Sequence, residues 1–92
     1  MTSNRNYDDP LYKAWRVAVF KRDRFRCQFP GCTCKTKLNA HHIIRWADAP
    51  SLRFEITNGI TLCKMHHKLI SGAEHCFMKL FGDIVRGKPK SK

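Results

Sequence analysis

The sequence predicts a small α+β domain built around a thin hydrophobic core. Its 92 residues are the length of one domain. A chain this short buries only roughly 60–65% of the surface that its unfolded form exposes, so small domains often carry a disulfide or a structural metal. Apolar residues recur at helical spacing near both ends of the chain and in two short β-like runs between them. These observations predict a few helices packed against a small sheet.

The first helix is expected to begin at Asp9-Pro10, because aspartate caps helix N-termini and proline suits the first helical position. The apolar residues that follow have the spacing of one face of an amphipathic helix, namely Leu11, Ala14, Trp15, Ala18 and Val19. Residues 1–8 are polar and are expected to be disordered. The domain is therefore expected over residues 9–85, followed by a basic disordered tail at residues 86–92.

The middle of the chain is expected to form two strands and a helix. Residues 38–44 are a strand candidate, residues 45–57 a loop, and residues 60–63 a β run that follows the turn signal Asn58-Gly59. A short helix is expected over residues 64–70, ending near Gly72. Residues 73–85 predict a final helix, because they carry a helical-period apolar set, Cys76, Phe77, Leu80, Phe81 and Ile84.

The charge of the chain is strongly positive, with 18 Lys and Arg against 7 Asp and Glu and a net charge of +11. Such a charge opposes folding by self-repulsion and indicates a polyanionic partner. Nucleic acid is favoured over an anionic membrane surface, because no long amphipathic helix with an extended apolar face is present. No apolar run approaches the ~20 residues of a membrane span, and the N-terminus lacks the apolar region of a signal peptide. A soluble, cytoplasmic protein is therefore expected.

Basic side chains supply the candidates for phosphate contact. Seven Lys and Arg lie between Arg5 and Arg26, against three Asp. An ordinary solvated helix face is the alternative interpretation of the same residues. The candidate DNA-contacting residues are Lys13, Arg16, Lys21, Arg22, Arg45 and Lys68.

The spacing of four residues predicts a structural zinc site. Cys27-x4-Cys32 and Cys63-x2-His66 are two pairs on tight turns, and each pair can present its side chains to one tetrahedral Zn2+. The count of five cysteines is odd, and histidines are interleaved with them, which favours reduced metal-binding cysteines over disulfides. Zinc binding would add folding free energy to a domain with little core.

Two further cysteines need a separate interpretation. Cys34 competes with Cys32 as a zinc ligand, although Pro30-Gly31 places a turn between Cys27 and Cys32. Cys76 lies within the C-terminal apolar set and is expected to be a buried free cysteine.

Four more polar residues remain once the zinc ligands are assigned, namely His41, His42, Asn58 and His67. Adjacent residues of a helix point about 100° apart, so His66 and His67 are expected to face different sites. Adjacent residues of a strand alternate faces, so His41 and His42 are also expected to have different roles.

One combination of these residues resembles the signature of the HNH endonucleases: the doublet His41-His42, then Asn58-Gly59, then Cys63-x2-His66-His67. The basic first helix and Cys27-x4-Cys32 resemble the small phage-type members, so the resemblance covers about residues 9–70. It implies the ββα-metal (His-Me finger) fold, in which two short antiparallel strands and a helix surround one divalent cation.

The resemblance also implies roles for individual residues. His42 would be the general base, His41 and His67 would hold the catalytic cation, and Asn58 would orient the loop. Arg45 would either clamp the scissile phosphate or lie on the surface. The reaction would hydrolyse DNA phosphodiester bonds to give a 5′ phosphate and a 3′ hydroxyl.

Three positions differ from the family pattern and bear on the choice of metal. His41 stands where phage-type members often carry aspartate, and His66 replaces a cysteine of the second zinc pair. Ser71 stands where some members carry a further ligand. Imidazole ligands suit Ni2+, Zn2+, Co2+ or Mn2+. Phosphate and water oxygens would complete the shell, so Mg2+ or Mn2+ is expected as the catalytic cation.

Three functions are compatible with these features. The first is a metal-dependent DNA endonuclease that nicks DNA or cuts it with little sequence preference. The second is a non-catalytic, zinc-stabilised nucleic-acid-binding module. The third is an adaptor within a phage packaging complex, with the terminase as the partner that the resemblance suggests. A monomer is favoured, and a monomer with one active site most simply nicks one strand, whereas a double-strand cut would need a dimer or two encounters.

Overall fold

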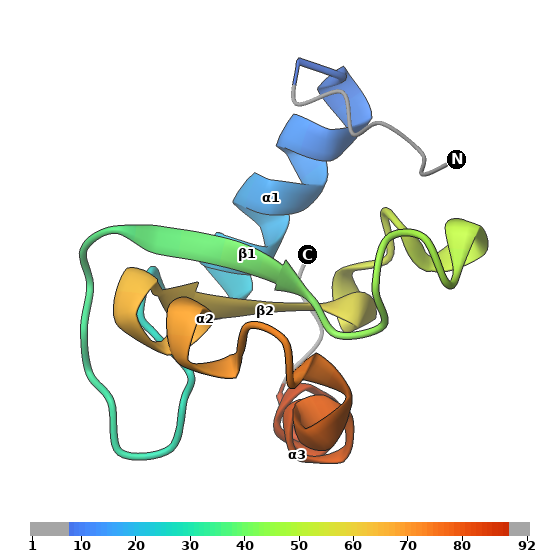
Figure 1. Cartoon of the computed structure of the whole chain (residues 1–92). Helices are drawn as coiled ribbons and strands as arrows, with labels where there is room; N and C mark the ends of the chain where they lie inside the picture. The colour runs from blue at the N-terminus through green and yellow to red at the C-terminus, as the bar shows by residue number, and fades with distance from the viewer. Residues whose placement is uncertain (1–7, 89–92) are drawn as a thin grey trace.

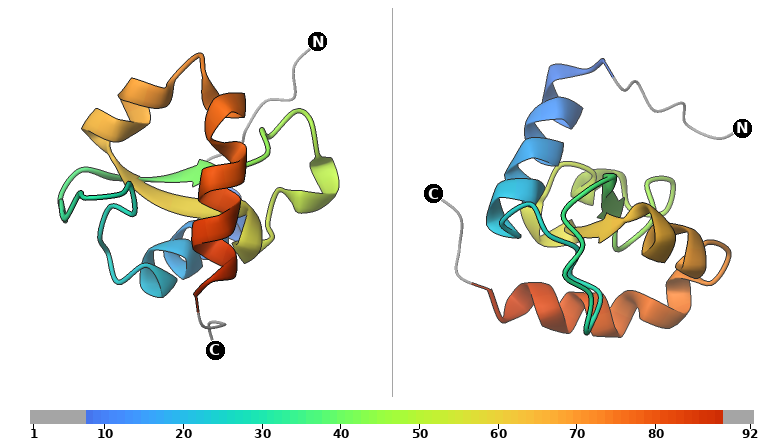
Figure 2. Two further views of the ribbon diagram at one scale, coloured as in Figure 1. Left: turned by 90° about the horizontal axis from the view of Figure 1, so that it is seen from below. Right: turned by 90° about the vertical axis from the view of Figure 1, so that its left-hand side faces the viewer.

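The computed structural model describes residues 8–88, in which a two-stranded sheet is flanked by helices on both faces (Figure 1). Helix α1 lies on one face, and α2 and α3 lie on the other (Figures 1 and 2). This arrangement confirms the predicted small α+β fold. The elements in chain order are α1 (Pro10–Arg22), β1 (Leu38–His42), the 3-10 turns η1 (Pro50–Leu52) and η2 (Ile56–Asn58), β2 (Gly59–Cys63), α2 (Lys64–Ile70) and α3 (Glu74–Arg86).

The register of the sheet decides which side chain faces which helix. Strands β1 and β2 are antiparallel, with His41 opposite Ile60 and His42 opposite Gly59. Directly opposed residues of an antiparallel pair share one face. Ile60 packs in the core cluster that contains Ile70 of α2 and Phe81 of α3, so His41 faces those helices. His42 and Gly59 face α1 instead.

Helix α1 begins as predicted, but its buried face is shifted by one residue in the first turn. The Asp9 side chain accepts a hydrogen bond from the Leu11 backbone N–H at 2.9 Å, and Pro10 is the first helical residue. Tyr12 is buried, whereas Leu11 is 61% exposed. Tyr12 rather than Leu11 occupies the buried position, because the Tyr12 ring packs on Trp15 at a centroid distance of 5.8 Å. Ala14, which the periodicity also placed in the core, is exposed.

Helix α3 covers the opposite face of the sheet through Phe81 and Val85, which are buried. The prediction that Cys76 is buried was wrong, since this cysteine is exposed. Phe81 has 0% exposure and anchors the helix, and Cys76 lies five residues earlier. At 100° per residue that separation places Cys76 about 140° away around the helix, on the solvent side.

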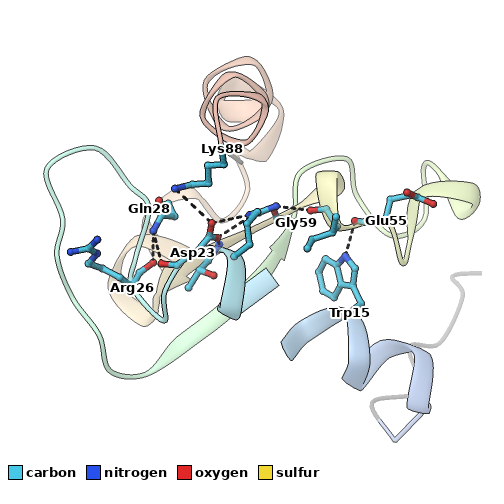
Figure 3. A network of polar contacts seen from close by, with 10 residues as sticks. Trp15, Asp23, Arg26, Gln28, Glu55, Gly59 and Lys88 are labelled. Atoms are coloured by element: carbon cyan, nitrogen blue, oxygen red, sulfur yellow. Dashed lines mark hydrogen bonds and ion pairs between the residues drawn. The ribbon is translucent and has the colours of Figure 1, made fainter. Parts of the chain in front are cut away.

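A buried ion pair joins the end of α1 to the sheet (Figure 3). The Arg22 guanidinium donates two hydrogen bonds of 2.9 Å to the Asp23 carboxylate. It also donates to the Ile56 carbonyl at 2.7 Å and to the Gly59 carbonyl at 2.6 Å. The Asp23 carboxylate in turn accepts the Thr61 N–H at 2.9 Å. The Arg22 side chain is only 5% exposed, so the prediction that Arg22 contacts DNA was wrong.

The predicted turn at Asn58-Gly59 is a 3-10 turn that ends at Asn58, directly before β2. Asn58 ends η2, and Gly59 has an extended backbone with φ of −127° at the start of β2. Glycine is required there by packing. A Cβ atom at this position would lie 2.5 Å from Val19 Cγ2 and 2.7 Å from Trp15 Cζ2. The missing side chain lets α1 approach the sheet closely.

The predicted terminal segments lie mostly outside the described residues. Within the described part, Arg86 still belongs to α3, and the Lys88 ammonium lies 3.9 Å from the Asp23 carboxylate (Figure 3). The predicted tail therefore begins later than residue 86. Among residues 8–88, no helix has both the length and the apolar character needed to cross a membrane.

Candidate metal and nuclease site

Four side chains from three parts of the chain converge on one point: Cys27, Cys32, Cys63 and His66. Their ligand atoms all lie within 4.8 Å of one another. Cys27 and Cys32 come from the loop after α1, Cys63 ends β2, and His66 lies in the first turn of α2. The structure thus brings together the four residues that the spacing had singled out.

The geometry of this cluster fits a tetrahedral zinc ion. Zinc bonds of about 2.3 Å to sulfur and about 2.0–2.1 Å to nitrogen place sulfur and nitrogen about 3.5 Å apart. The Nδ1 atom of His66 lies 3.3 Å from Cys63 Sγ and 3.7 Å from Cys27 Sγ. Burial raises the pKa of the Cys27 thiol to about 11. The metal-free thiol is therefore protonated at neutral pH, and metal binding must displace that proton.

An aromatic ring fixes the orientation of His66. The Phe29 ring stacks on the imidazole with centroids 4.2 Å apart and planes at 6°. Phe29 also contacts Phe77 and Phe81 of α3 through its ring, at 6.0 Å and 6.4 Å. The cluster is therefore tied to the core of α3 as well as to the sheet. Cys34, the competing ligand, lies outside the four-residue group, with its Sγ 3.5 Å from the Thr36 carbonyl oxygen.

A pair of histidines, His41 and His67, meets on the face of the sheet that α2 and α3 cover. The rings of His41 in β1 and His67 in α2 have centroids 5.6 Å apart and an interplanar angle of 68°. His41 is 7% exposed and also contacts Phe81 edge-on at 5.8 Å. His67 is exposed. As expected from helical geometry, His66 faces the cysteines while His67 faces His41.

His42 lies on the other face of the sheet and is 4% exposed. Its imidazole stacks on the Trp15 indole, with centroids 4.0 Å apart, and meets the Trp46 ring edge-on at 5.5 Å. The Nε2 atom lies 2.8 Å from the Arg53 carbonyl oxygen. Since a carbonyl only accepts, Nε2 carries the hydrogen, and Nδ1 is the nitrogen that can accept a proton in neutral imidazole.

Asn58 holds the loop between the strands through its side chain and backbone. Its Oδ1 accepts the Ile44 N–H at 2.8 Å, and its Nδ2 donates to the carbonyls of Ile44 and Leu52 at 3.1 Å and 3.2 Å. The Asn58 carbonyl accepts the Ile43 N–H at 2.9 Å. These bonds fix the chain directly after the His41-His42 doublet.

The predicted basic contacts differ in how they are placed. Arg45 is exposed, and its guanidinium pairs with the Asp48 carboxylate at 2.9 Å, which raises the pKa of Arg45 above its ordinary value. Lys13 lies 4.0 Å from the exposed Asp8 carboxylate, and the Arg16 guanidinium lies 4.7 Å from the Phe20 ring centroid. Lys21 and Lys68 are exposed, and neither forms such a contact with another residue among 8–88.

The sequence did not predict that three further residues lie near the site, namely Trp15, Phe29 and Glu74. Trp15 was interpreted only as an apolar residue of the first helix, and Phe29 was not singled out, because no local spacing shows that either ring stacks on a histidine. Glu74 begins α3, and its pKa is lowered mainly by its own backbone N–H and further by Gly72 N–H, His41 and Arg45. Only the fold brings this carboxylate near His41.

These features define a class of protein: a small domain in which two strands and a helix carry a pair of histidines in addition to a Cys3His cluster that could hold a metal ion. The model of the HNH endonuclease family matches residues 27–77, which is more than half of the chain. The chain therefore belongs to the HNH endonuclease family, as its sequence indicated. No curated protein and no solved structure matches the chain. Family membership indicates nuclease activity on nucleic acid with divalent metals.

Proposed function

We propose that the protein is a metal-dependent endonuclease that hydrolyses phosphodiester bonds of DNA. One observation carries the proposal: the rings of His41 and His67 meet 5.6 Å apart beside α2, while the next residue, His42, is oriented by the Arg53 carbonyl. The first pair offers two metal-ligating nitrogens, and the third histidine offers a base. The strands β1 and β2 with α2 would form the ββα-metal core of this family.

His41 and His67 would hold the catalytic cation. Two imidazoles leave most of a coordination shell open, which suits an ion that must also bind water and a phosphate oxygen. When bound, the cation would supply electrostatic stabilisation for the charge that develops on the phosphate and on the departing 3′ oxygen. Mg2+ or Mn2+ is proposed, because the remaining ligands would be oxygens.

His42 would act as the general base. Its imidazole would take a proton from the attacking water while the water oxygen bonds to phosphorus. The bond from phosphorus to the 3′ oxygen would break, and the 3′ oxygen would gain a proton from solvent. The products are a 5′ phosphate and a 3′ hydroxyl. Asn58 would keep the loop after His42 in place without taking part in the chemistry.

The Cys3His cluster would hold a structural Zn2+. The cluster joins the loop after α1, the end of β2 and the start of α2, so its metal would stabilise the unit that carries His41 and His67. A closed shell of four protein ligands leaves no position for substrate, which is typical of structural rather than catalytic zinc.

A second candidate function is favoured by one observation. His42 is 4% exposed, stacked on Trp15 and hydrogen-bonded to a backbone carbonyl, which is also how a structural histidine sits in a core. A non-catalytic zinc-stabilised DNA-binding module, alone or as an adaptor in a packaging complex, would use the same fold and charge.

Plasmid nicking separates the two functions. Supercoiled plasmid is incubated with the zinc-loaded protein and with Mg2+, Mn2+, Ni2+ or Co2+ in turn. We expect wild type to nick with Mg2+ or Mn2+, and His42→Ala to lose nicking while it retains DNA in a gel shift. His41→Ala should also lose nicking. Equal nicking by His42→Ala would refute the assignment of the base, and no nicking by wild type with any metal would favour the binding module.

A further inference from the structure

Three lysines gather beside His67 at the end of the sheet where β1 begins. Lys64 and Lys68 lie one helical turn apart on α2, and Lys37 directly precedes β1. All three line one cavity of about 340 Å3, together with Asn39 and His67. They also line a neighbouring cavity of about 410 Å3. Together, these three residues form the lysine surface, namely Lys37, Lys64 and Lys68.

Among the described residues 8–88, no carboxylate pairs with the charges of the lysine surface. No acidic residue lines either cavity. Within residues 8–88, none of the three lysines forms an ion pair, whereas Lys13, Arg45, Lys79 and Arg86 all do. Three adjacent unbalanced ammonium groups repel one another unless an anion lies between them. The site therefore fits a ligand with closely spaced negative charges.

Backbone geometry holds Lys37 in this position. Lys37 adopts φ of 52°, a left-handed conformation that is uncommon for a residue with a side chain. Its carbonyl accepts the Lys64 N–H at 2.9 Å, which ties the start of β1 to the start of α2. Backbone strain of this kind persists where surrounding structure fixes it and is often found at functional sites.

We infer that the lysine surface binds the phosphates of duplex DNA next to the phosphate that is cleaved, and this inference rests on the proposed function. Asn39 lines the cavity and lies two residues before His41 on the same face of β1. Two strand residues span about 6.8 Å. One strand of DNA can therefore reach from the lysine surface to the site at His41 and His67 within a few nucleotides.

The chemistry of the surface favours duplex over single-stranded DNA. Single strands are held by aromatic side chains on which bases stack. No Phe, Tyr or Trp lines either cavity. Lysine ammonium groups act as point charges that recognise the backbone without reading bases. Binding here should therefore position DNA independently of its sequence.

The salt dependence of binding tests this inference. Each lost phosphate contact makes the plot of log affinity against log salt less steep by about 0.9. We compare Lys64→Gln/Lys68→Gln on α2 with a matched control on α3, Lys79→Gln/Arg86→Gln, which removes the same charge. Affinity for a labelled 20-base-pair duplex is measured by anisotropy at 50–200 mM NaCl without added Mg2+ or Mn2+. For the α2 variant, the slope of log affinity against log salt should be less steep than that of wild type by about 1.8. Adding Lys37→Gln should increase this difference to about 2.7.

The outcomes distinguish this inference from the proposed function. Equal slopes for the α2 and α3 variants would overturn the lysine surface, even if wild type nicks DNA. A wild type that nicks no DNA would instead overturn the proposed function, while the binding slopes still decide the surface. Equal losses on duplex and single-stranded oligonucleotides would overturn the duplex assignment. Lys64→Arg/Lys68→Arg keeps both positive charges and should keep the wild-type slope. This variant therefore separates an effect of charge from poor folding of the Gln variant.

Discussion

The indole of Trp15 lies nearly parallel to the imidazole of His42, with planes at 12° and centroids 4.0 Å apart. The Trp15 Nε1–H also donates to the Glu55 carbonyl at 2.8 Å (Figure 3). One side chain of α1 therefore contacts both the histidine proposed as base and the loop that encloses it. Although α1 lies before the matched residues 27–77, its packing completes the surroundings of His42.

Replacing Trp15 should destabilise the domain strongly. Trp15→Ala removes a large buried side chain and is expected to cost about 3–5 kcal/mol of unfolding free energy. Urea denaturation monitored by circular dichroism gives this value. Leu11→Ala is the control on the same helix, because Leu11 is 61% exposed, and should cost less than about 0.5 kcal/mol. Equal losses for the two variants would contradict the packing of α1 described above.

Gly59 should not tolerate even one added methyl group. In Gly59→Ala the new Cβ would lie 2.5 Å from Val19 Cγ2, so α1 or β2 must move. Overpacking of this kind typically costs about 1–3 kcal/mol. Gly87→Ala is the control, since its Cβ would meet nothing closer than 3.6 Å. Unfolding free energies of both variants check the prediction, and a neutral Gly59→Ala would show that the helix is not held this close to the sheet.

The buried ion pair of Arg22 and Asp23 should contribute far more than the surface pairs of Asp83. Asp23→Ala leaves a buried guanidinium without its carboxylate, and such a loss costs about 3–5 kcal/mol. Asp83 pairs with Lys79 and Arg86 on the exposed side of α3, so Asp83→Ala should have little effect. Thermal melts of the two variants make the comparison. Similar melting temperatures for both would contradict a structural role for the buried pair.

Removing one zinc ligand should unfold the domain. Structural zinc contributes about 10–16 kcal/mol in zinc-finger peptides, which matches or exceeds the stability of most domains, about 5–15 kcal/mol. Cys63→Ser should therefore lose both the bound zinc and cooperative melting. Cys34→Ser and Cys76→Ser should each keep one zinc per chain, measured by inductively coupled plasma mass spectrometry. Loss of zinc in Cys34→Ser would show that Cys34 is a ligand.

The parts of the fold that depend on local spacing could be predicted from the sequence. The start of α1 at Pro10, the position of β1, the span of α2 and the grouping of Cys27 with His66 all follow from caps, periodicity and ligand spacing. A three-residue separation at the start of a helix fixes the relative positions of the two side chains. A tight turn between two cysteines does the same, and neither depends on the rest of the chain.

Features that depend on contacts between distant segments could not be predicted. Arg22 was predicted to contact DNA because Lys and Arg outnumber Asp near the N-terminus. Acceptors at Ile56 and Gly59, more than thirty residues away, make its burial favourable instead. The Asn58-Gly59 pair indicated a turn, whereas helix packing is what requires glycine. The enclosure of His42 by Trp15 and Trp46 is likewise a tertiary contact that no local pattern records.

The pairing of Gly59 with His42 has a consequence for the chemistry of the doublet. Two adjacent histidines on a strand are equivalent in composition, and a shift of the strand pairing by one residue would exchange their faces. His42 would then face His67, and His41 would face Trp15. Gly59, which lies opposite His42, leaves room for Trp15, because a Cβ atom at this position would lie 2.7 Å from Trp15 Cζ2. Under the proposed function, strand alignment rather than residue type would therefore decide which histidine is the metal ligand and which is the base.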